Sequence, residues 1–472
     1  MITTRRAFLR TLGVGAAAVL APRGRPARAE ERKRPLNIVF VLADDLGWAE
    51  LGCYGNTFNR TPHLDRLASR GMRFTDAYAA APVCSPFRAS LLAGQWPARV
   101  GITDYLRPND PKYLPEGIVT LAEMLKGAGY ATGMIGKWHL TGYRNHGAKE
   151  VPPTVQGFDE AIVSENRGIG GGSYFHPYHF NREIKKRLDG REYLVDRVNI
   201  EAVEFIRRHK GRPFFLYVSH YAVHTRLVGR PDLVAKYAAR PGAGKGNRAK
   251  RNNPHLAAQL ESIDTGVGMI VAELDKQGLA DDTILIFTSD NGGEDRVTSN
   301  APLRAGKSTL YEGGIREPLI VRWPGRVKGG SVCKTPVTSV DYYPTFRQIT
   351  GARPAGVQKL DGVSLLPLLN DPDAALKREA IYWHYPLARP HFLGGRSAGA
   401  VRAGDWKLIE FFDTGKAELY NLADDIGEKH DLGARRPAKV AELRKRLAAW
   451  RKDVGAKTTP RNRKRRGAGQ TR

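Results

Sequence analysis

Short runs of apolar residues recur between residues 36 and 322, and segments with apolar residues at helical spacing separate them. Uninterrupted runs rich in β-branched and aromatic residues are typical of strands buried on both faces of a parallel sheet. Such runs cover residues 36–42, 130–135, 213–219, 283–288 and 319–322. Capping residues, glycine stops and apolar periodicity predict helices over residues 61–71, 119–127 and 256–277. This alternation predicts an α/β fold with a large, mostly parallel central sheet and helices on both faces.

The pattern changes after about residue 367. Short strands joined by turns are predicted at residues 380–385, 399–402, 406–411 and 418–421. An amphipathic helix over 438–450 follows them. We therefore predict a main domain over residues 30–366 and a smaller α+β domain with an antiparallel sheet over residues 367–452.

The two ends of the chain differ from the body. Residues 1–29 contain adjacent arginines, a short apolar region and a small-residue cleavage site ending at Ala29, which is typical of a twin-arginine signal peptide. The alternative is a chance arginine pair before an uncleaved anchor. We predict export by the twin-arginine machinery, a mature start near Glu30, and a periplasmic or secreted bacterial protein. Residues 453–472 are basic and almost free of apolar residues, so we expect a disordered tail.

Charge separates this chain from an average globular protein. Its 75 Lys and Arg and 48 Asp and Glu give a formal net charge of +27. Six arginines lie in residues 1–29 and seven basic residues in 457–472, neither segment has an acid, and the body between them therefore keeps +14. A basic body favours anionic partners, such as sulfated or phosphorylated molecules, acidic polysaccharide or nucleic acid.

Composition excludes several classes of protein. Hydrophobic residues make up 41% and charged residues 26%, which excludes a collagen-like or wholly disordered chain. The sequence has no run of about 18 apolar residues, which excludes a multi-span membrane protein. Three cysteines exclude a disulfide-stapled scaffold. We interpret Cys53 and Cys333 as structural or free thiols.

Oxygen-bearing side chains follow two of the predicted strands. Asp44 and Asp45 come directly after residues 36–42, and Asp290 and Asn291 follow the strand at 283–288. Open α/β sheets bind ligands beyond the carboxyl ends of their strands. Four oxygen ligands without a nearby cysteine suit Ca²⁺ or Mg²⁺. Either pair alone would fit an ordinary turn equally well.

A second group of residues combines a thiol with cations and imidazoles. Cys84 stands at the start of a helix-like run that opens near Ser85, with Arg88 close by, so the helix start is a positive environment. The other members follow predicted strands or lie in a glycine-containing loop, namely Lys137, His139, His220, His224 and Lys307. Each has an ordinary interpretation, because a lone cysteine or histidine is more often structural and a lone lysine is usually solvated.

Together these segments resemble the type I sulfatases of the alkaline phosphatase superfamily, in the bacterial arylsulfatase and glycan sulfatase branch. The segment from Cys84 to Gly94 reads CSPFRASLLAG and matches that family's C-x-P-x-R signature with a downstream L-x-x-G. Other similar blocks are NIVFVLADDLGW, GKWH, TSDNGG, AGKSTLYEGGIREPLIVRWPG and ELYNLADDIGEKHDL. The resemblance runs from about residue 35 to residue 433 and assigns residues 30–366 as the catalytic domain.

The resemblance implies a cofactor set and a role for each motif residue. Cys84 would be oxidised to formylglycine (3-oxoalanine), an aldehyde that hydrates to a gem-diol. One Ca²⁺ per chain, with Mg²⁺ second, would be held by Asp44, Asp45, Asp290, Asn291 and modified Cys84. Arg88 and Lys137 would fix the diol, and His139 would assist its proton transfer. His224 and Lys307 would bind the sulfate and help protonate the leaving oxygen.

The sequence departs from the family in places that concern the substrate. Arg226 stands where this branch commonly has proline, either as a surface replacement or as an extra contact to an acidic substrate. Ser164 and residues 165–174 match the family poorly, so no role is assigned there. In the second domain, His384, His391 and Arg396 are predicted near the leaving group of the substrate.

The function predicted is hydrolysis of sulfate monoesters, most simply those of sulfated carbohydrates. A formylglycine-generating or sulfatase-maturing enzyme would be a partner, and no specific nucleic acid is expected. The alternatives are a phosphonate monoester hydrolase or phosphodiesterase of the same superfamily, and a non-catalytic protein that binds sulfated polysaccharide.

Overall fold

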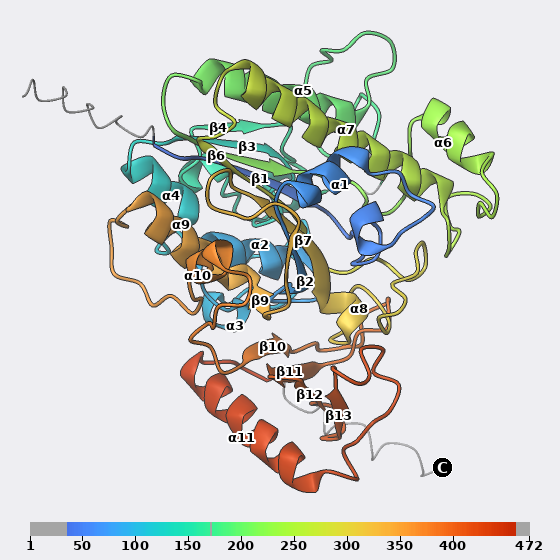
Figure 1. Cartoon of the computed structure of the whole chain (residues 1–472), viewed down its shortest axis with the longest axis vertical. Coiled ribbons are helices and arrows are strands. Elements are labelled where there is room, and N and C mark those ends of the chain that lie inside the picture. The colour runs from blue at the N-terminus through green and yellow to red at the C-terminus, as the bar shows by residue number, and fades with distance from the viewer. Residues whose placement is uncertain (1–34, 170–171, 459–472) are drawn as a thin grey trace, which may run out of the picture. The chain divides into compact units, whose positions relative to one another are not determined.

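The computed structural model describes residues 35–169 and 172–458, and its central feature is a nine-stranded sheet (Figure 1). The strand order is β4-β3-β5-β1-β6-β7-β2-β8, with β9 also beside β2. Strand β7 runs antiparallel to β6 and β2, whereas the other pairs are parallel. The strands are β1 (Asn37–Ala43), β2 (Met72–Tyr78), β3 (Ala131–Gly136), β4 (Glu160–Ile162), β5 (Phe214–Ser219), β6 (Thr283–Ser289), β7 (Arg316–Arg322), β8 (Ser331–Cys333) and β9 (Val337–Thr338).

Helices cover both faces of this sheet, as the sequence predicts. On one side lie α1, α5 and α7, and on the other α2, α4 and α9 (Figure 1). The helices of the body are α1 (Pro62–Ser69), α2 (Cys84–Ala93), α3 (Pro97–Val100), α4 (Leu121–Gly127), α5 (Leu194–His209), α6 (Pro231–Ala238), α7 (Pro254–Lys276), α8 (Glu312–Ile315), α9 (Tyr342–Thr350) and α10 (Leu366–Asn370). Single 3-10 turns occur at Gly52–Tyr54, Arg144–His146, Pro153–Gln156 and Ser339–Asp341.

The central strand β1 shows why the sheet needs both layers. Its side chains alternate between faces, and every residue of the strand is buried. Ile38 and Phe40 belong to the apolar core on the α2, α4 and α9 side. Val39 and Val41 belong to the core on the α1, α5 and α7 side. A strand that is apolar on both faces is stable only between two helical layers.

A second, antiparallel sheet follows in the C-terminal part, and α11 packs against it (Figure 1). Its elements are β10 (Ile381–Tyr385), β11 (Ala398–Ala403), β12 (Trp406–Phe411), β13 (Ala417–Asn421) and α11 (Pro437–Asp453). Its apolar core also contains Tyr78, Val83 and Trp96 from the body. The indole of Trp383 donates to the carbonyl oxygen of Ala79 at 2.7 Å. The second sheet is therefore packed directly on the first part of the chain.

The predicted α/β fold with a smaller antiparallel layer is confirmed. Each strand and helix predicted above appears within a few residues of its expected place. The elements that were not predicted are β2, β4, β8, β9, α3, α5, α6, α8, α9 and α10. The domain boundary predicted at residue 366 falls at the start of α10, and α11 includes Asp453, where the tail was predicted to begin. The predicted signal peptide and most of the predicted tail lie outside the described residues.

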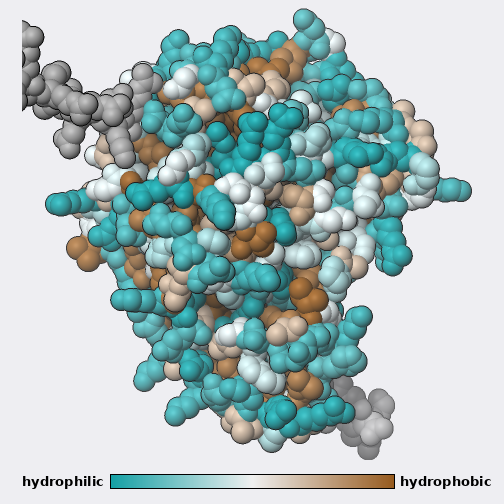
Figure 2. All heavy atoms as spheres, in the orientation of Figure 1, coloured by the Kyte–Doolittle hydropathy of each residue, from teal (hydrophilic) through white to brown (hydrophobic). Residues whose placement is uncertain are grey.

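The face shown in Figure 2 is mainly polar, with apolar residues interspersed among polar ones. Among the described residues, no helix is both long and apolar enough to cross a membrane.

Candidate active site

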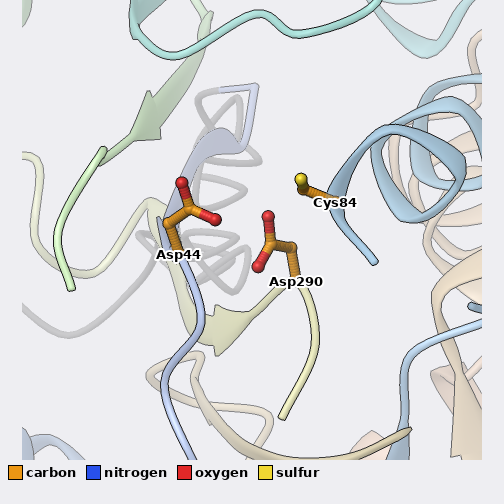
Figure 3. A group of neighbouring side chains, drawn as sticks. All are labelled: Asp44, Cys84 and Asp290. Atoms are coloured by element: carbon orange, nitrogen blue, oxygen red, sulfur yellow. The ribbon is translucent and has the colours of Figure 1, made fainter. Parts of the chain in front are cut away.

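The carboxyl ends of neighbouring parallel strands meet at one place and carry the predicted metal-binding and cationic residues. Strands β3, β5, β1 and β6 are adjacent and parallel, so their ends lie at the same edge of the sheet. The polar side chains there are Asp44 and Asp45 after β1, Asp290 and Asn291 after β6, and Lys137 after β3. Cys84, the first residue of α2, faces the same space as the carboxylates of Asp44 and Asp290 (Figure 3).

Asp44, Cys84 and Asp290 form the centre of the site. A carboxylate oxygen of each aspartate and the thiol sulfur lie within 4.8 Å of one another, and all three residues are buried. The Lys137 ammonium contacts Asp44 at 2.5 Å. The Arg88 guanidinium contacts Asp290 at 2.7 Å and donates to the Lys137 carbonyl oxygen at 3.0 Å. The structure therefore brings these five predicted residues together.

Asp45 organises the other half of the site. Its Oδ1 accepts from the Asn291 side-chain amide at 2.8 Å, and its Oδ2 accepts from the Lys307 ammonium at 2.7 Å. The His224 Nε2 lies 3.8 Å from the same Oδ2. The Asp45 backbone N–H donates to Asp290 Oδ1 at 3.1 Å. One carboxylate thus joins the two halves of the cluster.

Burial and ion pairing act against each other on these groups. Burial, reinforced by nearby Asp290, raises the pKa of Asp44 to about 8 despite the contact with Lys137. Burial acts the same way on Asp45, but Lys307, His224 and Lys137 together outweigh it, and the pKa of Asp45 falls below its ordinary value. Burial opposes the charge of Lys137 and Lys307, yet their acidic partners raise the pKa of both. Both lysines are therefore ammonium ions at neutral pH.

The backbone is held in unusual conformations around these side chains. Asp45 and His139 have φ values of 62° and 54°, in the left-handed region that non-glycine residues rarely adopt. Gly136 has φ 105°, and a Cβ there would lie 2.0 Å from the Ser219 carbonyl oxygen. Only glycine permits β3 to end so close to β5, which places the next residue, Lys137, in the site.

Comparison with known proteins shows which family the chain that carries this cluster belongs to. The Sulfatase family model matches residues 36–352, and the model for the N-sulphoglucosamine sulphohydrolase C-terminal region matches residues 305–453. The chain belongs to the sulfatase family. Its membership makes it a sulfuric ester hydrolase.

Relatives and solved structures agree with this sulfatase assignment. The chain is 31% identical to a sulfatase of Formosa agariphila, with 88% of each chain covered. It is 35% identical to human arylsulfatase A, covering 84% of this chain and 83% of that protein. A crystal structure of Ps i-CgsB in complex with k-i-k-neocarrahexaose has a TM-score of 0.77 and 30% identity, covering 88% and 93%. A phosphonate monoester hydrolase of Agrobacterium radiobacter, 21% identical with a TM-score of 0.62, shares the fold.

The oxygen atoms of the sulfatase site fit a bound cation. Asp44 Oδ1 and Asn291 Oδ1 are buried and have no hydrogen-bond partner among the described residues. Leaving buried polar atoms unpaired is costly, and a metal ion would satisfy both. Apart from the side chain at position 84, the donor atoms of this site are carboxylate and amide oxygens. The residues present therefore fit a hard divalent cation.

Cys84 is poorly suited to act as a thiolate. It is a free, buried cysteine, and burial raises the pKa of its thiol although Lys137 and Lys307 oppose the shift. All residues of α2 are buried, so the helix start is a rigid support for position 84. Cys53 and Cys333 are also free, as predicted.

His139 is positioned as a neutral proton acceptor. Its Nε2 lies 2.8 Å from the Leu106 carbonyl oxygen, which assigns the proton to Nε2. Nδ1 is buried and has no partner among the described residues. Burial, with Lys137 nearby, holds the pKa of His139 well below its usual range. Burial also lowers the pKa of His220 to about 3. Its Nδ1 has no hydrogen-bond partner among the described residues, and its backbone N–H donates to the Leu42 carbonyl oxygen at 2.9 Å.

Two positioning residues were missed by sequence reasoning. Ser219, the last residue of β5, accepts from Arg88 and donates to the Lys137 carbonyl oxygen at 2.8 Å. Its place at a strand end was the only signal in the sequence. Glu165 accepts from the backbone N–H groups of Trp138 and His139 at 3.0 and 2.5 Å. It lies in the segment that matches the family poorly, so no motif pointed to it.

Glu165 also accepts two phenolic hydroxyls. Tyr143 donates to its Oε1 at 3.1 Å and Tyr221 to its Oε2 at 2.8 Å. With four donors, this buried carboxylate fixes the loop that carries Lys137 and His139.

The substrate-binding residues predicted outside the cluster are dispersed. Arg226 is exposed on the loop after His224. His384 Nε2 lies 3.0 Å from the Lys457 carbonyl oxygen, and Arg396 pairs with Asp413 at 2.9 Å. Within the described part of the chain, neither His384 nor Arg396 contacts a residue of the cluster, so their role in substrate binding stays a prediction.

His391 lies closer to the catalytic cluster. Its pKa is lowered to about 4, first by burial and then by Lys307. The same loop approaches Lys307 through Gly395, where a Cβ would lie 2.0 Å from the Ser308 carbonyl oxygen.

Proposed function

We propose that this sulfatase hydrolyses sulfate monoesters of sulfated carbohydrates, using a formylglycine made from Cys84 and one bound cation. The observation that carries the proposal is the buried group of Asp44, Cys84 and Asp290, surrounded by Arg88, Lys137 and Lys307. Carbohydrate as the substrate class is supported by Ps i-CgsB, whose structure contains a neocarrahexaose.

Asp44, Asp45, Asp290 and Asn291 would hold the cation together with modified Cys84. We propose Ca²⁺ rather than Mg²⁺ on the family resemblance, since oxygen ligands admit both. A bound divalent cation supplies Lewis-acid polarisation and lowers the pKa of a hydroxyl next to it.

A formylglycine at position 84 supplies, as its hydrate, a hydroxyl nucleophile and a second hydroxyl that allows the aldehyde to be regenerated. The α2 N-terminus favours negative charge on that oxygen. Arg88 and Lys137 flank the same position and are held by Asp290 and Asp44. Their side chains therefore orient the nucleophile and neutralise charge that develops on it.

His139, His224 and Lys307 would carry out proton transfer and sulfate binding. Neutral His139 has a free Nδ1 that accepts a proton at the nucleophile. Lys307, protonated and only 8% exposed, neutralises an oxygen of the sulfate group. His224 lies beside Asp45 at the same end of the site. Burial lowers its pKa to about 3 and its Nδ1 bonds the Thr225 carbonyl oxygen, so His224 is neutral and would assist protonation of the leaving oxygen with Lys307 as the proton donor.

We further propose that the protein is exported as predicted, by the twin-arginine route to the periplasm or the outside of the cell. That route carries folded proteins. A formylglycine-generating or sulfatase-maturing enzyme would act on Cys84 before folding, because Cys84 is buried afterwards.

Turnover of matched esters tests the proposal. The protein should release nitrophenol from 4-nitrophenyl sulfate with a kcat/KM at least about tenfold above that for the phosphonate and phosphate analogues, a difference of about 1.4 kcal/mol in transition-state binding. Cys84→Ala should remove activity, and Cys53→Ala, a cysteine outside the site, should keep it. Faster turnover of the phosphonate would favour the other hydrolase class, and binding without turnover in correctly matured protein would favour a non-catalytic binder.

Chelation tests the cation separately. Removal of the metal should abolish turnover and lower the melting temperature, because buried aspartates lose their counter-ion. Ca²⁺ should restore both at lower concentration than Mg²⁺. An unchanged melting temperature and activity after chelation would contradict a bound cation.

A further inference from the structure

Three cavities that share lining residues lie between the catalytic cluster and a basic surface. A small cavity is bordered by Asp44 and His224 and also by residues 172–174. A second, of about 490 Å³, shares residues 172–174 and extends to Arg191 and Arg226. A third, of about 580 Å³, shares Arg226 and Asn247 with the second. Arg226 therefore lies at the junction of the two larger cavities.

The third cavity carries a net positive charge from its side chains. Glu294 lines it, but both of its oxygens are occupied, by Arg296 at 2.5 Å and by the Thr225 hydroxyl at 2.8 Å. The charges of Glu294 and Arg296 cancel. Arg226 and Arg248 also line the cavity, and both are exposed.

Arg226 and Arg248 have no carboxylate partner within residues 35–169 and 172–458. Exposed Arg396, by contrast, pairs with Asp413 at 2.9 Å. Two unpaired guanidinium groups on one concave surface repel each other and attract anions. Their planar donors match the oxygens of a sulfate or carboxylate, which they bind in pairs.

We propose that Arg226 and Arg248 form a subsite for a second anionic group of the substrate, a sulfate or carboxylate on the glycan beyond the ester that is cleaved. The proposal rests on the function proposed above and narrows the substrate class to glycans with several anions. Arg226 follows His224 by two residues and so joins the subsite to the catalytic cluster, whereas Arg248 comes from the loop between α6 and α7. Arg191, in the adjoining cavity, adds a cation on the same side.

Binding of matched disaccharides tests the subsite without turnover. The probes are chondroitin disaccharides that carry one sulfate or two sulfates on the same backbone. Their dissociation constants are measured by calorimetry at low salt, on the Cys84→Ala protein with Ca²⁺ present. The disulfated probes should bind at least about tenfold more tightly than the monosulfated ones, and Arg226→Gln with Arg248→Gln should reduce that ratio about fivefold or more, as expected for losing two partly exposed ion pairs.

The control removes the same charge from the loop that carries Arg248. Lys250→Gln with Arg251→Gln replaces two exposed cations that do not line the cavities, and it should keep the ratio. An equal loss in this control, or an unchanged ratio in the Arg226 and Arg248 variant, would overturn the subsite. Melting temperatures show whether each variant is folded.

The outcomes separate the subsite from the proposed function. One outcome is that Arg226 and Arg248 favour disulfated over monosulfated disaccharides while the matured wild-type protein releases no sulfate from any ester. This result would support the subsite and refute the proposed function. The opposite outcome is that the wild type releases sulfate from 4-nitrophenyl sulfate, but its preference for disulfated disaccharides does not depend on the two arginines. This result would refute the subsite and support the proposed function.

Discussion

Balanced burial of charge is the main property of the site at the scale of single residues. Three aspartates and three cationic side chains are buried together, namely Asp44, Asp45, Asp290, Arg88, Lys137 and Lys307. With all six groups ionised their charges cancel, so the protein alone presents little net charge to an anion. A divalent cation would make the site net positive, which an anionic sulfate ester requires. This balance explains why the site needs both a metal and three basic residues.

Glu165 shows that positioning matters as much as the reacting groups. Glu165→Gln should reduce kcat about 10- to 100-fold, the range for residues that orient a ligand or catalytic group, because the amide cannot accept from all four donors. The change in KM should be small, since Glu165 does not face the substrate. Steady-state kinetics on 4-nitrophenyl sulfate measure both constants.

Glu183→Gln, an exposed glutamate in the same region, is the control and should behave as the wild type. A Glu165→Gln enzyme with wild-type kcat would show that the Lys137 and His139 loop holds its shape without this carboxylate.

At the scale of elements, apolar runs predicted the strands that carry the site, because β1, β5 and β6 are buried on both faces. The same rule missed β2 and α5. Strand β2 contains Asp76, which pairs with Arg316 and Arg402 far along the chain. Helix α5 buries the ion pair of Arg197 and Glu201 within its apolar face. In β2 the tertiary ion pairs replace apolar residues, and in α5 the i,i+4 pair interrupts an otherwise apolar face.

The contact of α5 with α7 depends on a glycine. A Cβ at Gly266 would lie 1.9 Å from Asn199 Oδ1, and Asn199 is buried and bonded to the Ser262 carbonyl oxygen. Gly266→Ala should therefore destabilise the fold by about 1–3 kcal/mol, since overpacking outweighs the helix propensity gained. Urea unfolding measures the change.

Gly127→Ala is the matched control, because Gly127 is helical and has no atom within 4 Å of a Cβ built there. It should be neutral or stabilising by up to about 1 kcal/mol. Equal stability of the two variants would mean that α5 and α7 separate without cost.

At the scale of the whole molecule, the C-terminal sheet is tied to the body by buried charge as well as by its apolar core. Lys407 on β12 contacts Glu312 of α8 at 2.7 Å and Glu428 at 2.9 Å, and all three side chains are fully buried. Burial raises the pKa of Glu428 to about 7, whereas Lys407 and neighbouring arginines outweigh burial and lower the pKa of Glu312 to about 2. The lysine therefore neutralises acids from both parts of the chain.

Lys407→Met should destabilise the protein by about 3–5 kcal/mol, because two buried carboxylates lose their shared cation. Lys416→Met, at an exposed position between β12 and β13, should change stability little. Thermal unfolding followed by calorimetry should show one transition in the wild type, since the two sheets share a core. Two separated transitions would mean that the C-terminal sheet unfolds independently.

The motif residues around the metal were foreseeable because they follow strands or begin a helix, whose ends the sequence marks. The positions of Glu165, Arg248 and the cavities were not foreseeable, because loops bring them together without a local pattern. His384 and Arg396 were predicted from their domain alone, and their contacts are with Lys457 and Asp413.

The chemical state of residue 84 decides whether this protein can use a formylglycine nucleophile. The most direct measurement is the mass of the peptide that contains Cys84, from protein purified out of its natural host. Conversion of the thiol to an aldehyde lowers that mass by about 18 Da. We expect this decrease in mass in most of the active protein. A plain thiol in protein that still releases sulfate from 4-nitrophenyl sulfate would contradict it.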